Sequence, residues 1–194
     1  MNKGQLLIVN IGKEKTIEVY EDGRLIKIIN NVIIGKNGLT EANNKKEGDK
    51  KTPIGLFNLG ISFGIHKLNI NYPYIKIQDN DYWVDDINSK YYNYFVRIGD
   101  VIPSFGYSYI KSINFSDFLT AEHLINFKTF YEYAVFIEYN IQSTKCKGSA
   151  LFLHCKSNNN YTSGCIAVSK RDMEFIINFI NINKNPKILI QNIK

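Results

Sequence analysis

Short apolar runs, some of them alternating with polar residues, recur along the chain and predict β-strands. In the first third they cover residues 5–10, 16–20 and 24–34. The pair Asp22–Gly23 separates the second run from the third. Asp-Gly between two apolar segments favours a type I′ turn, because both central residues of that turn need positive φ. The chain is therefore predicted to begin with a β-hairpin.

Loops and further strands are predicted after this hairpin. Residues 35–51 are polar and glycine-rich, which predicts a loop long enough to be functional. The stretch 60–116 is dense in aromatic residues, as expected of short strands and loops packed over a β core. Additional strands are predicted at residues 54–59, 134–139, 150–154 and 187–193.

One helix is predicted near the C-terminus. Ser169 and Asp172 form an S-x-x-D capping signal. Apolar residues with the helical spacing i, i+3, i+4, i+7 follow it, namely Met173, Ile176, Ile177 and Ile180. The pair Asn185–Pro186 ends this segment before the final strand. A second helix is predicted at about residues 116–127, so the pattern indicates a mainly β protein with one or two helices.

Length and composition indicate one globular domain. The chain has 194 residues, 44% hydrophobic and 22% charged, and a chain of this size buries roughly 70% of its unfolded surface. No internal repeat or linker divides it. No apolar run approaches the roughly 20 residues of a membrane span, and the run within residues 6–11 is too short for the core of a signal peptide. We expect a single domain over residues 1–194 without an integral membrane segment.

The charge is moderately basic. Twenty-four Lys and Arg against 18 Asp and Glu give a net charge of +6. The lysines are scattered singly or in pairs, whereas nucleic-acid-binding faces cluster basic residues with interleaved aromatics. The excess favours a solvated surface or mild steering toward an anionic polymer such as a cell-wall glycopeptide. Nucleic acid is not an expected partner.

The cysteines direct attention to one segment. Cys146, Cys155 and Cys165 lie within twenty residues, beside His154. An odd number of cysteines leaves at least one thiol unpaired, which argues against a simple disulfide framework and indicates a candidate reactive thiol.

A histidine at the end of a strand and a cysteine in the following loop could meet across two adjacent strands. His154 ends the apolar run 150–154, and Ser163–Gly164 directly precede Cys165. Such a pair suits acyl transfer, because an imidazolium lowers the thiol pKa from about 8.5 and the imidazole then returns the proton to the leaving group. The glycine lets backbone amides approach a developing oxyanion.

Two motifs in this order carry a resemblance to a known family. The first is T-P-x-G-x-F at residues 52–57, and the second is H-C followed by T-S-G-C-I at residues 154–155 and 162–166. Together they resemble the catalytic domain of the L,D-transpeptidases of the YkuD type. The likeness extends over about residues 35–183, with the N-terminal hairpin part of the same domain.

The resemblance implies a β-sandwich-like catalytic fold and a cysteine acyltransferase of peptidoglycan. In that reaction a thiolate attacks a stem tetrapeptide, terminal D-alanine leaves, and an acceptor amine resolves the thioester. Cys165 is then the nucleophile and His154 the base, with the backbone carbonyl of Cys155 orienting the imidazole. The amides of Gly164 and Cys165 are the expected oxyanion donors, next to Ser163. No cofactor or metal is implied.

The same resemblance implies further consequences. Ser163 stands where the family often has histidine, and Ala167 where it often has arginine or asparagine. Peptidoglycan stem peptides are the expected partner and the bacterial cell envelope the expected location, although no export segment is visible. A carbapenem would be expected to acylate the nucleophile. Candidate substrate-binding residues are Glu122, His123, Trp83 and Arg171.

Other functions remain open on the sequence. Water in place of the acceptor amine would give an L,D-carboxypeptidase, and an inert Cys165 would indicate a non-catalytic wall-binding domain. A zinc site at His154, Cys155, Cys165 and His123 is disfavoured, because adjacent residues cannot easily both reach one tetrahedral ion. An activated Cys165 should be alkylated much faster than the other two cysteines.

Overall fold

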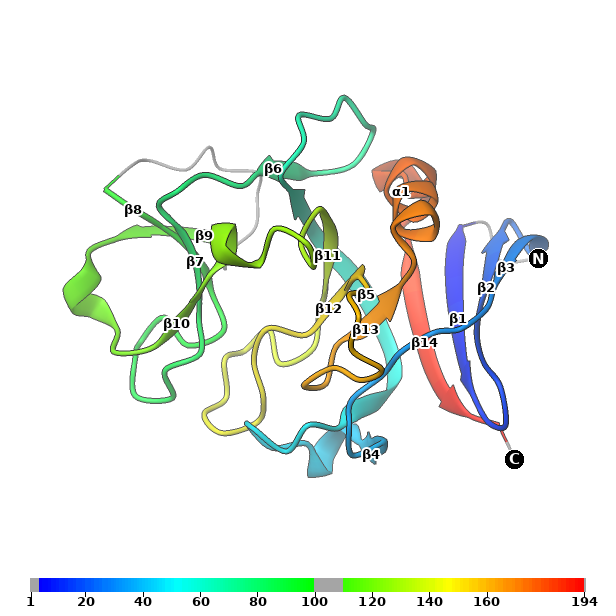
Figure 1. Ribbon diagram of the computed structural model, residues 1–194, viewed down its shortest axis with the longest axis horizontal. Coiled ribbons are helices and arrows are strands. Elements are labelled where there is room, and N and C mark those ends of the chain that lie inside the picture. The colour runs from blue at the N-terminus through cyan, green and yellow to red at the C-terminus, as the bar shows by residue number, and fades with distance from the viewer. Residues whose placement is uncertain (1–3, 100–109, 194) are drawn as a thin grey trace.

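A computed structural model describes residues 4–99 and 110–193 of the protein (Figure 1), and these residues form two β-sheets. The larger sheet runs in the order β13 (Ile166–Val168), β12 (Phe152–Cys155), β11 (Tyr133–Ile137), β5 (Thr52–Gly64), β14 (Lys187–Asn192), β1 (Gln5–Ile11), β2 (Lys15–Glu21) and β3 (Arg24–Ile29). Two short strands also pair with β5, namely β4 (Leu39–Glu41) and β6 (Tyr74–Lys76). The predicted mainly β architecture is confirmed.

The smaller sheet and one α-helix complete the fold. Its strands lie in the order β10 (Ala121–His123), β7 (Asp81–Val84), β8 (Phe95–Ile98) and β9 (Ile110–Ile113). The helix is α1 (Lys170–Phe179), and the described 3₁₀ turns are Ala42–Asn44, Phe115–Asp117, Leu124–Phe127 and Ile182–Lys184. Within the described chain no helix is long and apolar enough to cross a membrane.

The N-terminal hairpin forms as predicted. Asp22 and Gly23 have φ values of 48° and 80°, the positive values that a type I′ turn requires. Strand β1 also pairs in parallel with β14, and β14 pairs with β5. The hairpin therefore extends the same sheet that carries the central strands, at the right-hand side of Figure 1.

Strand alternation divides the core into two clusters. Leu153 and Cys155 of β12 pack in a cluster that includes the buried face of α1. Phe152, on the opposite face of β12, packs among aromatic side chains that include Trp83 and Phe95 of the smaller sheet. Because side chains alternate along a strand, His154 shares its face with Phe152. The smaller sheet and α1 consequently lie on opposite sides of the central strands (Figure 1).

Two predicted elements differ in the structure. The helix predicted at 116–127 is wrong: two 3₁₀ turns flank strand β10 there, because residues 121–123 pair antiparallel with β7. The loop predicted at 35–51 contains β4 and a 3₁₀ turn. In both places pairing with a strand distant in sequence overrides the local pattern.

The capping signal of α1 is confirmed. The backbone amide of Asp172 donates to Ser169 Oγ at 3.1 Å, and Asp172 also lies 2.8 Å from Lys27 Nζ of β3. The cap satisfies one of the amides that have no partner within the first turn of a helix.

Replacing Ser169 with alanine should lower the free energy of unfolding by about 1 kcal/mol, because the Asp172 amide loses its acceptor. Urea denaturation followed by circular dichroism measures the change. Ser169→Thr keeps the hydroxyl and should be close to wild type. Equal losses in the two variants would contradict the capping role.

Candidate active site

The candidate nucleophile and base line one cavity of about 200 Å³. Strands β12 and β13 pair in parallel, with His154 opposite Ala167 and Leu153 opposite Ile166. This register sets Cys165, which directly precedes β13, beside Phe152 and near the histidine face of β12. The described cavity wall comprises Glu122, Phe127, Phe130, Tyr131, His154, Asn159, Tyr161, Thr162, Ser163 and Cys165.

The thiol of Cys165 is held by the backbone of the adjoining segment. The amide of Phe152 donates to Sγ at 3.3 Å, and the thiol donates to the carbonyl oxygen of Ala150 at 3.2 Å. Ala150 has a φ of +51°, a left-handed conformation uncommon for alanine. The thiol therefore lies against the segment entering β12.

The imidazole of His154 is fixed by the contact expected of Cys155. Its Nδ1 lies 2.8 Å from the carbonyl oxygen of Cys155. A carbonyl can only accept, so the proton of the neutral ring is on Nδ1 and Nε2 is a proton acceptor. The ring is 5% exposed and packs edge-on against Phe130 and Tyr131.

The expected ion pair between Cys165 and His154 is absent at rest. No hydrogen bond joins the two side chains, both of which belong to the described residues, because the thiol proton is directed at Ala150. Burial raises the pKa of Cys165 to about 12, helped by the charge of Glu122 and opposed by the Phe152 amide. Burial lowers the pKa of His154 to about 4. Both groups are therefore neutral near pH 7.

The two sequence motifs are joined by Thr52. Its hydroxyl donates to the carbonyl of Gly164 at 2.7 Å and accepts from the amide of Gly35 at 2.9 Å. Gly164 has a φ of +141°, and a Cβ there would lie 3.0 Å from the carbonyl oxygen of Lys51. The threonine of the first motif thus fixes the glycine of the second, where a side chain would be strained.

The oxyanion role expected of the Gly164 amide does not fit the resting structure. That amide donates to Thr162 Oγ1 at 3.1 Å, and the same hydroxyl donates to the carbonyl of Cys165 at 2.6 Å. The T-S-G-C loop closes on itself through this threonine. An oxyanion at Gly164 would have to displace the Thr162 hydroxyl.

A buried lysine supports the same loop. Lys45 is 6% exposed, and its Nζ donates to Asp49 Oδ1 at 2.6 Å and to the Lys46 carbonyl at 2.9 Å. Its side chain passes within 3.9 Å of the position that a Cβ on Gly164 would take. The ammonium lowers the pKa of Cys165, but less than burial raises it.

The four candidate substrate-binding residues separate in space. Glu122 lines the cavity, whereas His123, the next residue of β10, stacks on Tyr82 at 4.3 Å and lies 2.6 Å from the Asp79 carbonyl. Successive side chains of a strand point to opposite faces, so both could not face the cavity. His123 is therefore outside it.

Trp83 and Arg171 likewise lie outside the described wall of the cavity. Trp83 is 0% exposed within the aromatic cluster and donates its indole N–H to Asn93, so it cannot reach a substrate. Arg171 lies on α1, beyond the described cavity wall. Ser163 does reach the cavity, as an exposed residue on its wall.

Asn93 is a supporting residue to which the sequence assigns no role. Its Oδ1 accepts from the Ala150 amide and the Trp83 indole, each at 3.0 Å. Its Nδ2 donates to the carbonyls of Asn140 at 3.0 Å and Tyr139 at 3.3 Å. One 2% exposed side chain thus fixes the residue whose carbonyl holds the thiol. The signal in the sequence is the pair Tyr92–Asn93 within residues 35–183, which adds to the resemblance to the family.

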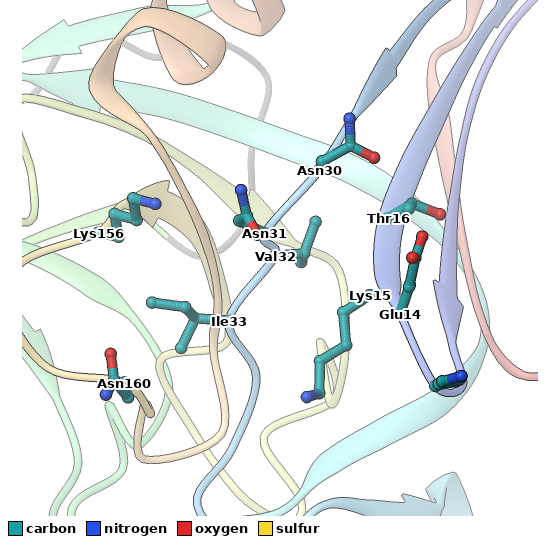
Figure 2. Close-up of a pocket in the computed structure, with 10 residues that line it drawn as sticks. Glu14, Lys15, Thr16, Asn30, Asn31, Val32, Ile33, Lys156 and Asn160 are labelled. Carbon is teal, nitrogen blue, oxygen red and sulfur yellow. The ribbon is translucent and has the colours of Figure 1, made fainter.

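A larger pocket of about 810 Å³ lies beside residues 156–160 (Figure 2). Its described lining is mainly polar and contains no cysteine or histidine: Lys13, Glu14, Lys15, Thr16, Asn30, Asn31, Val32, Ile33, Lys156 and Asn160. Acyl transfer needs a nucleophile and a base, so the smaller cavity is the candidate active site. Among residues 4–99 and 110–193, no three His, Cys, Asp or Glu side chains form a group that could hold a metal ion.

Comparison with known proteins assigns the family. The model of the L,D-transpeptidase catalytic domain, YkuD, matches residues 4–190. The chain therefore belongs to the YkuD family, whose members are enzymes that act on peptidoglycan. The matched region is wider than the residues 35–183 over which the motifs carry the resemblance. A comparison with curated proteins finds no match.

Solved structures give more distant likenesses. The helical cell shape determining protein Pgp2 from Campylobacter jejuni is 16% identical with a TM-score of 0.49, over 98% of this chain and 48% of that one. The L,D-transpeptidase of Xylanimonas cellulosilytica is 13% identical with a TM-score of 0.44, over 98% and 62%. L,D-transpeptidase 1 of Mycobacterium tuberculosis is 15% identical with a TM-score of 0.43, over 96% and 61%. The chain thus spans about half to three fifths of these structures.

Alkylation of the folded protein should be faster at Cys146 than at Cys165, the reverse of the expectation from sequence. Cys146 is exposed, whereas burial raises the pKa of Cys165 to about 12 and leaves almost no thiolate at pH 8. Mass spectrometry of peptides after brief iodoacetamide treatment measures the two rates. In urea the rates should converge, and faster labelling of Cys165 in the folded protein would contradict a neutral resting thiol.

Replacing Asn93 with alanine should lower the free energy of unfolding by about 3 kcal/mol, because the buried N–H groups of Ala150 and Trp83 lose their acceptor. Denaturant titration measures the loss. The same variant should alkylate faster at Cys165, because the Ala150 carbonyl is no longer fixed. Asn88→Ala, an exposed control whose side chain donates no described hydrogen bond, should change neither quantity.

Proposed function

We propose that the chain is a peptidoglycan L,D-transpeptidase in which Cys165 is the nucleophile and His154 the general base. The observation that supports this most directly is the shared cavity of the thiol and the imidazole, with Nδ1 of the imidazole 2.8 Å from the Cys155 carbonyl. This tautomer presents Nε2 as an acceptor for the thiol proton. Membership of the YkuD family supplies the substrate class.

The first half of the reaction forms a thioester. The thiol leaves the Ala150 carbonyl, its proton passes to His154 Nε2, and Sγ bonds to the carbonyl carbon of the third stem residue. Burial disfavours both the separate thiolate and the separate imidazolium. Proton transfer therefore coincides with formation of the carbon–sulfur bond. His154 then gives the proton to the amine of D-alanine as the peptide bond breaks.

Backbone amides stabilise the negative charge of the tetrahedral intermediate. The amide of Cys165 is one donor, and the amide of Gly164 becomes the second when the substrate oxygen displaces Thr162 Oγ1. An acceptor amine then attacks the thioester and forms the cross-link. Water at the same step would make the enzyme an L,D-carboxypeptidase. Since peptidoglycan lies outside the cytoplasmic membrane, we place the activity in the cell envelope.

Incubation of the protein with tetrapeptide muropeptides should release D-alanine and give cross-linked dimers that mass spectrometry detects. Cys165→Ser should lower the rate by about a thousandfold or more, and His154→Gln by a similar factor, because each removes one half of a unit that acts together. A carbapenem should add its mass to Cys165 alone.

Cys146→Ser is the matched control, since Cys146 is exposed and outside the described wall of the cavity. It should turn over at the wild-type rate. If the tetrapeptide muropeptides gave tripeptide product and no cross-linked dimers, the enzyme would be a carboxypeptidase. The cysteine mechanism would be rejected if Cys165→Ser left turnover unchanged. It would also be rejected if neither the muropeptide nor the carbapenem formed an adduct at Cys165.

A further inference from the structure

Glu122 supplies a carboxyl group to the cavity that Cys165 and His154 also line. It lies on β10 of the smaller sheet, whereas Cys165 and His154 belong to the edge of the larger sheet. The thioester mechanism assigns Glu122 no step. Its charge is nevertheless felt at the thiol, whose pKa it raises. The carboxyl group and the thiol thus line the same cavity and interact electrostatically.

The carboxyl group is oriented by Tyr131. The Tyr131 hydroxyl donates to Oε2 of Glu122 at 2.5 Å, and the Tyr131 ring packs edge-on against His154 at 5.8 Å. Among the described residues no hydrogen bond engages Oε1. The Tyr131 hydroxyl thus fixes Oε2, and Oε1 remains able to accept a proton.

The electrostatic surroundings of Glu122 favour the binding of a cationic group. Negative charges at Asp85 and Glu47 act on its carboxyl group, and Oδ1 of Asp85 is buried with no hydrogen-bond partner in the described structure. Taking the carboxyl group out of water raises its pKa to about 7, and these charges add to the rise while the Tyr131 hydrogen bond opposes it. A primary ammonium would relieve this repulsion.

We propose that Glu122 is the proton acceptor for the acceptor amine, the group that converts an arriving primary ammonium into a nucleophile for the Cys165 thioester. This rests on the proposed function and adds the chemical class of the second substrate. The geometry that supports it is the cavity that Glu122 shares with Cys165 and His154, together with an Oε1 atom that no described hydrogen bond engages. Arg171 and His123, the basic candidates from sequence, lie elsewhere.

The protons balance in two steps. The ammonium gives one proton to the Glu122 carboxylate and becomes a neutral amine with a lone pair. The lone pair attacks the thioester carbon, and His154 takes the second proton from the nitrogen and passes it to Sγ as the carbon–sulfur bond breaks. The products are the new amide and the neutral thiol. Protonated Glu122 then returns its proton to solvent.

The test is the ratio of amine product to water product from tetrapeptide muropeptides, measured between pH 6 and 9. In the wild type this ratio should rise through about pH 7, as Glu122 ionises. Glu122→Gln should lower the ratio about tenfold or more at neutral pH and remove the rise near 7. Glu122→Asp keeps a carboxylate and should retain part of the rise in the product ratio near pH 7. Tyr131→Phe should move the rise to higher pH, because the hydrogen bond that lowers the Glu122 pKa is gone.

Hydroxylamine separates proton transfer from a merely structural role. It is largely unprotonated near neutral pH, so its capture of the thioester needs no base to remove a first proton. With added hydroxylamine, the ratio of hydroxylamine product to water product should therefore be close to the wild-type ratio in Glu122→Gln. A variant defective with both acceptors would indicate a distorted cavity and would overturn the proposal.

Two outcomes distinguish this proposal from the proposed function. If the wild type forms the Cys165 acyl-enzyme and Glu122→Gln gives the wild-type product ratio at every pH, only the role of Glu122 is overturned. If the wild type forms no acyl-enzyme at Cys165, both are overturned. Circular dichroism and thermal unfolding of each variant verify that it is folded.

Discussion

The parallel pairing of β12 with β13 is the interaction on which the site depends. It joins only three residues of each strand, yet it sets Ala167 opposite His154 and so determines where Cys165 lies. Any other register would place the thiol beside another residue of β12, and a shift by one residue would turn the side chains of β13 to the opposite face. The segment 156–165 between the strands can therefore be polar and irregular while the two reactive groups share a cavity.

Burial both packs the side chains of this site and keeps the thiol and the imidazole uncharged. Aromatic rings cover the face of β12 that carries Phe152 and His154. Trp83 of the smaller sheet packs on Phe152, and Phe130 and Tyr131 pack on His154, which is 5% exposed. The same burial raises the pKa of the thiol and lowers that of the imidazole. A neutral thiol and a neutral imidazole avoid two uncompensated buried charges, which would cost several kcal/mol each. In the mechanism we propose, the sulfur bonds to the substrate carbonyl carbon as the thiol proton moves to the imidazole.

Segments far apart in the sequence hold the thiol in place. Thr52 at the start of β5 donates to Gly164. Asn93, two residues before β8, accepts from the amide of Ala150, whose carbonyl accepts from the thiol. Both contacts are hydrogen bonds from nearly fully buried side chains, which are costly to leave unpaired. The nucleophile is thus supported from both sheets, although only one sheet carries it.

The sequence by itself determined the elements with strong local signals and indicated candidate residues for the reaction. The Asp22–Gly23 turn and the Ser169 cap are local, because each depends on backbone angles or contacts within a few residues. The two motifs likewise indicated Cys165 and His154 as the candidate nucleophile and base. Only the tertiary structure decided that Glu122 faces the cavity and His123 does not, because strand pairing with β7 replaced the predicted helix there. The protonation of the thiol was decided in the same way, since burial depends on what the rest of the chain packs around it.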